Sequence, residues 1–554
     1  MTGASILAMS WTNATWISAT WIDATSLSAT SISAAWINPA VIALYLVVLL
    51  ALGLYFSRRQ TTTESYFVAR RSIPGWAMGI SLLATIITSL TFVSYPGSAF
   101  AGDWSLMMPG VMILIVPVIA GFVIVPFYRH AVRMSAFEYF GSRFGRPVRV
   151  YAALMFGVGH LAKMGFVFYL LALTVNSITG WRVESLLLLA GAAAVLYALV
   201  GGLEAVIWAD VLQAILLACG ALVAVGYLLF LPPGGPAHTL GVAWHAHKMS
   251  LGSTSLSLHS PTLLVLLLYG TFFYFQKYTA DQSVVQRYLS AKTDRSALRG
   301  ILLGAALCLP VWALFMLIGS LLWSYYRITG ERLPAYVTKG DQIFPYFFST
   351  HLPAGVAGLF LAALFGAAMA MLASDLNCLA MIIVEDAYRL LRPASADRAQ
   401  LRVGRIAVLG VGAAALAVAW ALVHSRGTAL ALYYGVMSVV AGGLAGLFLL
   451  AFLSTRATAR AAQVGIAANL ICTLWATLTE SASLAARLHL PRFTWHEYMI
   501  GVVGNVVLIG VGYATAIVAP APRAARHGLT LWTWLEQRKR EPIEPSVVKE
   551  PTAA

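Results

Sequence analysis

The chain has 554 residues, of which 60% are hydrophobic and 10% are charged, and its mean hydropathy is +0.80. A water-soluble protein of this length needs a more polar surface, so the composition predicts a membrane protein. The net charge of +15 does not indicate nucleic-acid binding, because the basic residues stand in short loops between apolar runs. We therefore expect the lipid bilayer as a partner and no nucleic acid, and we predict no stable protein partner.

Residues 11–40 repeat a five-residue unit, as in WTNAT, WISAT and WIDAT. The first basic residue is Arg58, so this stretch lacks the basic start of a secretory signal peptide. Its composition predicts a low-complexity, polar, exported tail over residues 1–39, with a short amphipathic surface segment as the alternative. We assign this tail no function.

After Pro39 the chain consists of long apolar segments, each near the roughly 20 residues that cross a bilayer as a helix. The thirteen predicted spans are 40–57, 75–98, 106–127, 150–176, 184–200, 205–230, 262–278, 299–324, 354–380, 405–424, 429–453, 461–479 and 498–519. They predict an all-α integral membrane domain over 40–519. Residues 520–554, with RKR at 538–540 and several prolines, are expected to form a basic cytoplasmic tail.

The positions of the basic residues predict the orientation. If the N-terminus is outside, 27 of the 36 Lys and Arg residues stand in inside segments, eight stand outside and Lys163 lies in mid-span. Basic residues concentrate in cytoplasmic loops, so we expect the N-terminus outside and the C-terminus in the cytoplasm. An odd number of spans agrees with this orientation, and we expect the chain in the cell (inner) membrane.

Motifs for ATP use or for enzymatic chemistry are not found in the sequence. It has no GxxxxGK[ST] stretch, which argues against ATP-driven transport. The histidines are scattered without metal-ligand or nucleophile spacing, which argues against a membrane enzyme. We expect no enzyme activity and no cofactor apart from a sodium ion. The four cysteines lie inside apolar runs and are interpreted as packing residues: Cys219, Cys308, Cys378 and Cys472.

Four stretches carry a resemblance to a known family. They are ESYFVARRSIPGW (64–76) running into SLLATIITSLTFVSYPGSAF (81–100), YALVGGLEAVIWADVLQ (197–213), DQSVVQRYLSAK (281–292) and LAALFGAAMAMLASDLNCLAMIIVEDAYRLLRP (361–393). In order and spacing they resemble the sodium/solute symporter family, which includes sodium–sugar, sodium–proline and sodium–sialate cotransporters. The resemblance covers roughly residues 40–460.

The resemblance implies a LeuT-type core of two inverted repeats of five helices, at about 75–230 and 262–453. One extra helix would precede this core and two would follow it. We expect a break in the first core helix at Tyr95-Pro96-Gly97, because proline removes a backbone N–H and carbonyls freed at a break can coordinate a cation. A simple kink near the end of the helix is the alternative.

The family binds sodium between the first and eighth core helices, through backbone carbonyls and two adjacent hydroxyl side chains. The resemblance places the carbonyls at Ala84, Ile87 and Ala367 and the hydroxyl pair at Ala370 and Met371. Neither of these last two side chains offers a hard oxygen ligand. The helical spacing of Ala367, Ala370 and Met371 puts them on one face, so this largely apolar face argues against sodium coupling here.

A second sodium position is used by some relatives, with an Asp on the fifth core helix and a Ser on the eighth. These correspond to Asp210 and Ser374, and Asp375 follows where the family usually has a small or apolar residue. Acidic groups at membrane depth are functional candidates, and two close carboxylates suit a proton carrier. We hypothesise coupling through Asp210 and Asp375, by a proton or by a relocated sodium at Asp210 and Ser374. The alternatives are that Asp210 pairs with Lys163 and that Asp375 lies at a wet cytoplasmic mouth.

The substrate pocket is predicted to suit an anion better than a sugar. Where sugar transporters carry Asn, Glu and Lys, this chain has Ile86, Leu90 and Cys308. Lys277 would favour a carboxylate, although its snorkelling to the cytoplasmic surface is the alternative. His160, one turn before Lys163, is interpreted as a packed polar residue rather than a proton relay. The substrate-binding candidates are Thr88, Ser89, Thr91, Tyr274, Gln276, Lys277 and Tyr278.

These observations predict a secondary active transporter that moves a small polar solute, with an anion favoured, by alternating access. The coupling ion is expected to be sodium or a proton. The alternative is an uncoupled facilitator or a substrate sensor built on the same fold. The apolar pair at Ala370 and Met371 favours that alternative, and the carboxylates of Asp210 and Asp375 oppose it.

Overall fold

The computed structural model describes residues 40–56 apart from 42, 46, 49 and 50, then 62–87, 89–132, 134–179, 181–334, 337, 340–353, 355–424, 443–518 and 529–540. The secondary structure of these ranges is helical, apart from an isolated bridge between Ile73 and Ala291. This confirms the all-α prediction. The predicted tail at 1–39 and part of the predicted span 429–453 lie outside the described residues.

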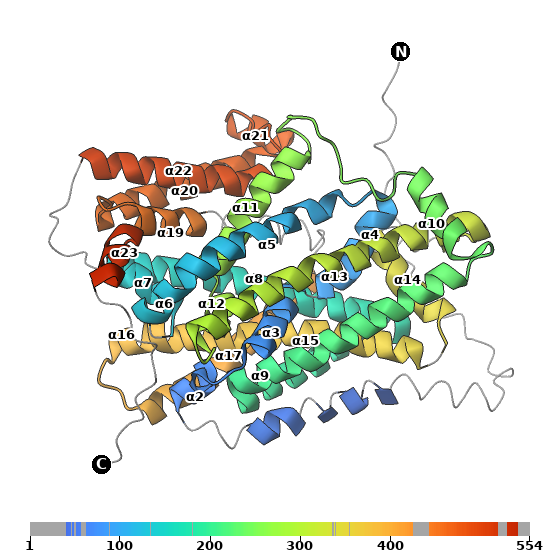
Figure 1. Ribbon diagram of the computed structural model, residues 1–554, viewed down its shortest axis with the longest axis horizontal. Helices are drawn as coiled ribbons and strands as arrows, with labels where there is room; N and C mark the ends of the chain where they lie inside the picture. The colour runs from blue at the N-terminus through green and yellow to red at the C-terminus, as the bar shows by residue number, and fades with distance from the viewer. Residues whose placement is uncertain are drawn as a thin grey trace.

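The helices follow one another along the described part of the chain (Figure 1). Up to the middle of the chain they are α2 (Thr63–Val68), η1 (Ala69–Arg71), α3 (Gly75–Ile86), α4 (Ser89–Ala101), η2 (Ser105–Met107), α5 (Met108–Ile119), η3 (Ala120–Ile124), α6 (Val125–Ala131), α7 (Ala136–Phe144), α8 (Arg146–Thr179), α9 (Val183–Phe230) and α10 (Gly235–His245). They continue as α11 (Leu263–Thr279), α12 (Gln282–Leu289), α13 (Asp294–Thr329), η4 (Gly340–Gln342), α14 (Ile343–His351), α15 (Val356–Ile382), η5 (Ile383–Tyr388), α16 (Arg389–Leu391), α17 (Asp397–His424), α19 (Leu444–Leu453), α20 (Ala459–Thr479), α21 (Ala482–Leu488), α22 (Tyr498–Val518) and α23 (Leu531–Arg540).

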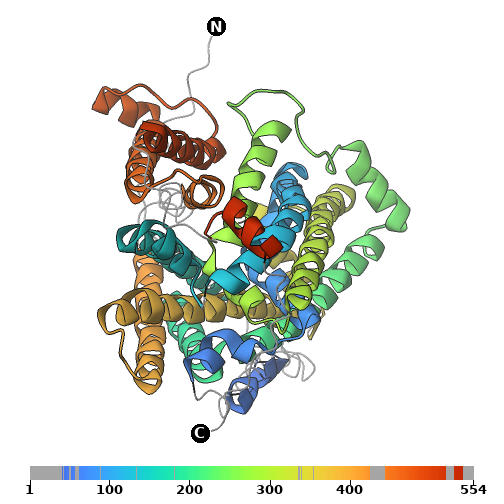
Figure 2. The ribbon, with the colours of Figure 1, turned by 60° about the vertical axis from the view of Figure 1, so that its left-hand side comes forward.

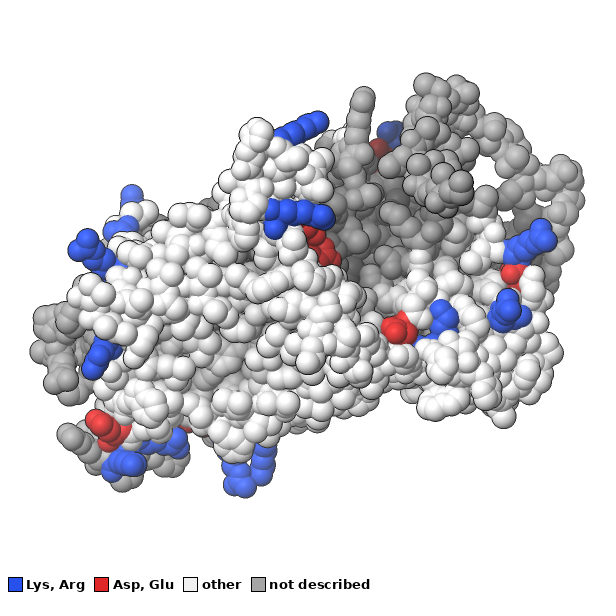
Figure 3. Space-filling view, turned by 90° about the horizontal axis from the view of Figure 1, so that it is seen from above, with Lys and Arg blue, Asp and Glu red and all other residues white. Residues whose placement is uncertain are grey.

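Among the described residues, eight helices are long and apolar enough to cross a membrane, or nine if the bent pair α3 and α4 counts as one span. The predicted count of thirteen is therefore not confirmed. Two further apolar pieces, Val183–Leu196 and Leu444–Leu453, are shorter than a full span. Figure 3 shows a face that is mostly uncharged, with Lys and Arg side chains scattered over it. Such a surface suits a lipid environment.

Gly202 interrupts α9 with backbone angles of φ 58° and ψ −169°. An L-amino acid with a side chain rarely adopts this conformation, and glycine adopts it without steric strain. The interruption falls between the predicted spans 184–200 and 205–230. The two predicted spans are therefore two helical segments of α9 that meet at a kink at Gly202.

The first core helix is broken, but not where the sequence predicted. The axes of Gly75–Ile86 and Thr91–Ala101 differ by 55°, and Ile87 at the break is extended, with ψ 112°. The prediction of a break at Tyr95-Pro96-Gly97 is wrong, because these residues lie inside α4. The break follows a run of β-branched residues, Thr85 to Thr88, whose stiff side chains disfavour helix.

The Pro96 region is instead a packing surface. A Cβ atom added at Gly319 of α13 would lie 2.2 Å from the Pro96 carbonyl oxygen. A Cβ added at Gly300 would lie 2.4 Å from the Gly75 carbonyl oxygen, and one at Gly79 would lie 2.5 Å from the Gly300 carbonyl oxygen. Small residues at helix interfaces allow backbones to approach closely in membranes. The broken helix therefore packs along α13 through glycines.

Helix α15 is the most enclosed of the long apolar helices, with 88% of its most apolar window buried. It packs against α9, α17, α8 and α3. Helices α20 and α22 pack against each other, to one side of this group, where α22 contacts α19 and α11 (Figures 1 and 2). Each charged side chain that α8, α9 and α12 direct toward α15 therefore enters the interior of the molecule.

Candidate functional site

Helix α12 is short and polar in composition, yet all of its residues are buried. Asp281 caps its first turn by accepting a hydrogen bond from the Ser283 N–H at 2.9 Å. The Gln286 amide donates to the Phe67 carbonyl oxygen at 2.5 Å and to Asn377 Oδ1 at 2.7 Å. Because buried polar groups require partners, the polar residues of the DQSVVQRYLSAK stretch are explained by these interior contacts.

Arg287 of α12 is fully buried and joins four helices. Its Nη2 lies 2.9 Å from Asp210 Oδ2 of α9, and its Nε donates to Ser81 Oγ of α3 at 2.7 Å. Its Nη1 donates to Ser374 Oγ of α15 at 2.9 Å and to the Ser283 carbonyl oxygen of α12 at 2.8 Å. Charge-assisted hydrogen bonds of this kind are the stronger class, so the guanidinium holds α3, α9, α12 and α15 together.

Asp210 and Ser374, the predicted sodium ligands, do lie at the same place in the structure, but both of them bind the guanidinium of Arg287. The Ser81 hydroxyl also donates to Asp210. The alternative pairing of Asp210 with Lys163 is not formed, because Asp210 pairs with Arg287. Sequence reasoning did not select Ser81, and it counted Arg287 among the loop cations. The sequence did contain one indication for Arg287, because this residue lies in DQSVVQRYLSAK, the third of the stretches that resemble the family.

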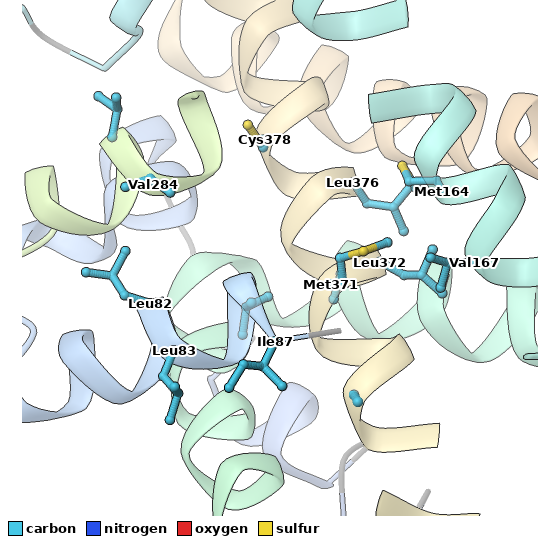
Figure 4. Close-up of a cluster of buried hydrophobic side chains, with 14 of the residues drawn as sticks. Leu82, Leu83, Ile87, Met164, Val167, Val284, Met371, Leu372, Leu376 and Cys378 are labelled. Carbon is cyan, nitrogen blue, oxygen red and sulfur yellow. The ribbon is translucent and has the colours of Figure 1, made fainter. Parts of the chain in front are cut away.

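The other ion-site equivalents form an apolar contact between α3 and α15. Ile87 is 2% exposed and Met371 is fully buried, and Ala84 and Ala367 are buried as well. Figure 4 shows Ile87 at the end of α3 and Met371 on α15, with apolar side chains around them. The side chain of Ala370 lies outside the described residues. The described side chains at this position thus supply no oxygen ligand.

Asp375 lies in the interior and faces α8 rather than a water-filled mouth. Its side chain is fully buried. Its Oδ2 lies 2.9 Å from the Nζ atom of Lys163, and its Oδ1 lies 2.9 Å from Nδ1 of His160. Both partners belong to α8, one turn apart. The carboxylate is therefore compensated by charge from a helix that sequence reasoning had not connected to it.

His160 links Asp375 to a second carboxylate. Its Nε2 lies 3.4 Å from Asp281 Oδ2, and the same oxygen lies 2.5 Å from the Nζ atom of Lys277. Lys277 therefore pairs within the protein instead of snorkelling to the surface. The order Lys163, Asp375, His160, Asp281, Lys277 defines one continuous group, which we call the buried charge network. It joins α8, α11, α15 and the residue that caps α12.

The substrate-binding candidates are only partly brought together. Tyr274 of α11 is buried, with its ring centroid 6.2 Å from that of Trp312 of α13, and Trp312 stacks with Tyr95 of α4 at 6.1 Å. Tyr278 and Thr91 are buried as well, and Gln276 is half-buried. Thr88 and the side chain of Ser89 lie outside the described residues. Sequence reasoning did not select Trp312 or Tyr95 as substrate-binding candidates, because aromatic residues in apolar helices carry no distinct signal.

Charged and polar side chains occupy this interior, and metal-ligand clusters do not. Among the described residues, no three His, Cys, Asp or Glu side chains lie close enough to hold a metal ion. The four cysteines are free. The arrangement can bind an anion through its lysines, exchange a proton at its imidazole, or admit a cation to its carboxylates. These are the chemical steps of ion-coupled solute binding.

Comparisons with known proteins agree with this interpretation. The profile of the "Sodium:solute symporter family" matches residues 66–468. The sodium/sialic acid symporter NanT of Aliivibrio fischeri is 30% identical over 477 residues, covering 85% of this chain and 91% of the relative. The sodium/sialic acid symporter SiaT of Proteus mirabilis is 30% identical over 486 residues, covering 87% of this chain and 95% of the relative.

A solved structure supports the fold directly. It is the substrate-bound outward-open state of a Na+-coupled sialic acid symporter, and it matches with a TM-score of 0.79 and 31% identity. The match covers 88% of this chain and 99% of that chain. The predicted fold class is thereby confirmed. The chain belongs to the sodium:solute symporter family, so it is a multi-pass secondary active transporter of a small solute and not an enzyme.

Proposed function

We propose that this chain is a cation-coupled symporter for a small anionic solute of the sialic acid class. The observation that carries the proposal is the buried charge network, which places the cations of Lys163 and Lys277 in the interior of the helix bundle. Charged side chains at membrane depth mark solute and ion pathways. The similarity to two sodium/sialic acid symporters supports the solute class.

Two unpartnered polar groups on α11 and α13 suit a solute rich in oxygen atoms. The hydroxyl of Tyr278 and the indole N–H of Trp312 are buried and have no hydrogen-bond partner among the described residues. An unpartnered buried donor costs about 1–3 kcal/mol, which a bound acceptor can recover. Carboxylate and hydroxyl oxygens of a sugar acid provide such acceptors, while the lysines provide the opposite charge.

The coupling ion is the second part of the proposal. Sodium is the ion of the named relatives, and Asp210 with Ser374 is the pair that we propose for it here. In this structure the guanidinium of Arg287 lies between them, so sodium enters only when Arg287 moves away. A proton is the alternative coupling ion to sodium, and proton coupling requires only a titratable side chain in the network.

The orientation and the domain limits remain part of this proposal. We place the chain in a bacterial inner membrane, with an exported tail at 1–39, a transmembrane domain at 40–519 and a basic cytoplasmic tail at 520–554. The excess of Lys and Arg in the segments assigned to the cytoplasm supports this orientation. Protease accessibility of tags at the two ends, in right-side-out vesicles, tests it.

Uptake into proteoliposomes tests the function. Radiolabelled sialic acid is followed under an inward sodium gradient, an inward proton gradient, both gradients or neither. We expect accumulation above the external concentration under at least one cation gradient, with competition by other sugar acids and none by glucose. Equilibration without accumulation would instead show an uncoupled facilitator. The absence of both uptake and binding would contradict the proposed solute.

A further inference from the structure

Both ring nitrogens of His160 lie close to carboxylate oxygens inside the protein. The Nδ1 atom lies 2.9 Å from Asp375 Oδ1, and the Nε2 atom lies 3.4 Å from Asp281 Oδ2. His160 is 8% exposed, and both aspartates are buried. The two carboxylates come from different elements, α15 and the N-terminal cap of α12, so the imidazole bridges them.

A neutral imidazole does not fit this position well. It has one N–H group and one lone pair, so one of its nitrogens would present a lone pair to a carboxylate oxygen. The imidazolium ion has an N–H on each nitrogen and attracts both carboxylates. The Phe156 ring stacks on the imidazole with a centroid separation of 3.8 Å, and an aromatic face also favours a cation. Both features would stabilise a positive charge on the ring.

The charges around His160 come from several helices. Lys163 lies on its own helix and reaches Asp375, while Lys277 of α11 reaches Asp281. The thiol of Cys378 on α15 lies near both carboxylates. Charged residues on the other elements that surround α8 interact with partners outside the network. These interactions are Asp210 with Arg287, Arg149 with Asp386, His351 with Glu331, Asp397 with Thr63, Glu138 with the Ser135 N–H, Arg143 with the Ala451 carbonyl and Arg405 with the Tyr66 ring.

The protonated network carries an unbalanced charge. With an imidazolium, the side chains of Lys163, His160 and Lys277 are three cations against the carboxylates of Asp281 and Asp375. One positive charge is left over in a low-dielectric interior, where uncompensated charge is unfavourable. A monovalent anion balances the network. Without the proton, the same anion would leave one negative charge in excess.

We propose that His160 is the proton-binding site of this transporter, and that a solute anion and one proton bind together and leave together. The proton comes from the side on which the solute binds, resides on the imidazole between Asp281 and Asp375, and departs with the solute on the other side. The inference rests on the proposed function, and it adds a proton to the ions that the family name implies.

Lumenal pH measurements test the proposal. Proteoliposomes of the full chain are loaded with a pH-sensitive dye in potassium buffer, with valinomycin to clamp the voltage, and radiolabelled sialic acid is added outside, in parallel with and without sodium. We expect the lumen to acidify by about one proton for each sialic acid taken up. Acidification of the outer medium should increase the uptake, because it supplies more of the co-transported proton on the side of entry.

Two substitutions of His160 distinguish the role of its proton from the role of its positive charge. His160→Gln removes both, so we expect sialic acid counterflow to fall at least tenfold and acidification to stop. His160→Lys keeps a permanent cation, so counterflow should persist without pH dependence while acidification stops. His351→Gln is the matched control, since His351 also pairs with a carboxylate, Glu331 at 2.9 Å, and it should behave as wild type.

The outcomes distinguish this inference from the proposed function. Wild-type uptake that needs sodium and leaves the lumenal pH unchanged would overturn the proton site and leave the symporter intact. Acidification that persists in either His160 variant would also overturn it. Where a variant does not fold, as judged by size-exclusion chromatography, the wild-type pH measurement alone decides. No uptake by the wild type under any gradient would overturn the proposed function itself.

Discussion

Asp210 and Arg287 form an ion pair in which both side chains are fully buried. Removal of one member leaves the other as an uncompensated charge in the interior, which costs roughly 3–5 kcal/mol. Asp210→Asn should therefore lower the thermal unfolding temperature strongly, and Asp210→Asn combined with Arg287→Gln should recover part of the loss. Differential scanning fluorimetry in detergent measures both effects.

The control for this pair is Glu184→Gln. Glu184 lies 3.7 Å from Arg182, whose side chain is 82% exposed. Exposed pairs contribute about 0–1 kcal/mol, because water screens them. Equal destabilisation by the two substitutions would show that burial of the Asp210 pair does not determine its contribution.

The apolar position between α3 and α15 allows a gain-of-function test. Ala370→Ser with Met371→Ser supplies two hydroxyl oxygens at the positions where the family resemblance places the sodium-binding hydroxyl pair. We expect a thermal shift in sodium over potassium that the wild-type position does not give, since a ligand bound to the folded state raises its stability. Met371→Ala is the control, because it removes the same packing and adds no oxygen. Equal sodium shifts in both variants would place the sodium elsewhere.

Individual charges in apolar segments could be found from the sequence, but their partners could not. Asp210, Asp375 and Lys163 are conspicuous because few charges occur at membrane depth. Which of them pair depends on helices distant in sequence, and Lys163 reaches Asp375 rather than Asp210. Arg287 and His160 were not selected as site candidates for the same reason, since a loop-like context or a lone imidazole carries no partner information.

At the level of single helices, the backbone conformation at Gly202 disfavours any residue that has a side chain. Gly202→Ala must adopt a positive φ of 58° with ψ −169°, which costs on the order of 1–3 kcal/mol. We expect a lower unfolding temperature for this variant. Gly226→Ala in the same helix is the control, because a Cβ there meets nothing within 4 Å, and it should be neutral or slightly stabilising.

The sequence predicted the long apolar helices more reliably than the positions at which helices break. Long apolar runs predicted α8, α13, α15, α20 and α22 because length and hydropathy are local properties. The break in the first core helix was misplaced, because proline was weighted above the β-branched run that ends α3 at Ile86. Helix α12 was treated as part of a cytoplasmic segment, since its polar composition does not reveal that all its residues are buried.

On the scale of the whole molecule, α23 connects the chain end to the helix bundle. Trp534 is 6% exposed, with its ring 5.9 Å from that of Phe127 of α6, and the Trp532 indole donates to the Leu453 carbonyl at 2.9 Å. Trp534→Ala should cost roughly 3–5 kcal/mol through lost packing. Trp532→Ala, at a residue that is 53% exposed, should cost about 1 kcal/mol. Similar unfolding temperatures would show that α23 does not contribute through packing.

The four-helix attachment of Arg287 has a consequence for the tightness of the membrane barrier. Helices α3, α9, α12 and α15 cannot separate without giving up its bonds to Asp210, Ser81 and Ser374. Hydrogen bonds to charged groups contribute about 1.5–3 kcal/mol each. Because these bonds would be lost together, we expect an empty carrier to open spontaneously only rarely, and we expect little leakage of ions or solutes between productive turnovers.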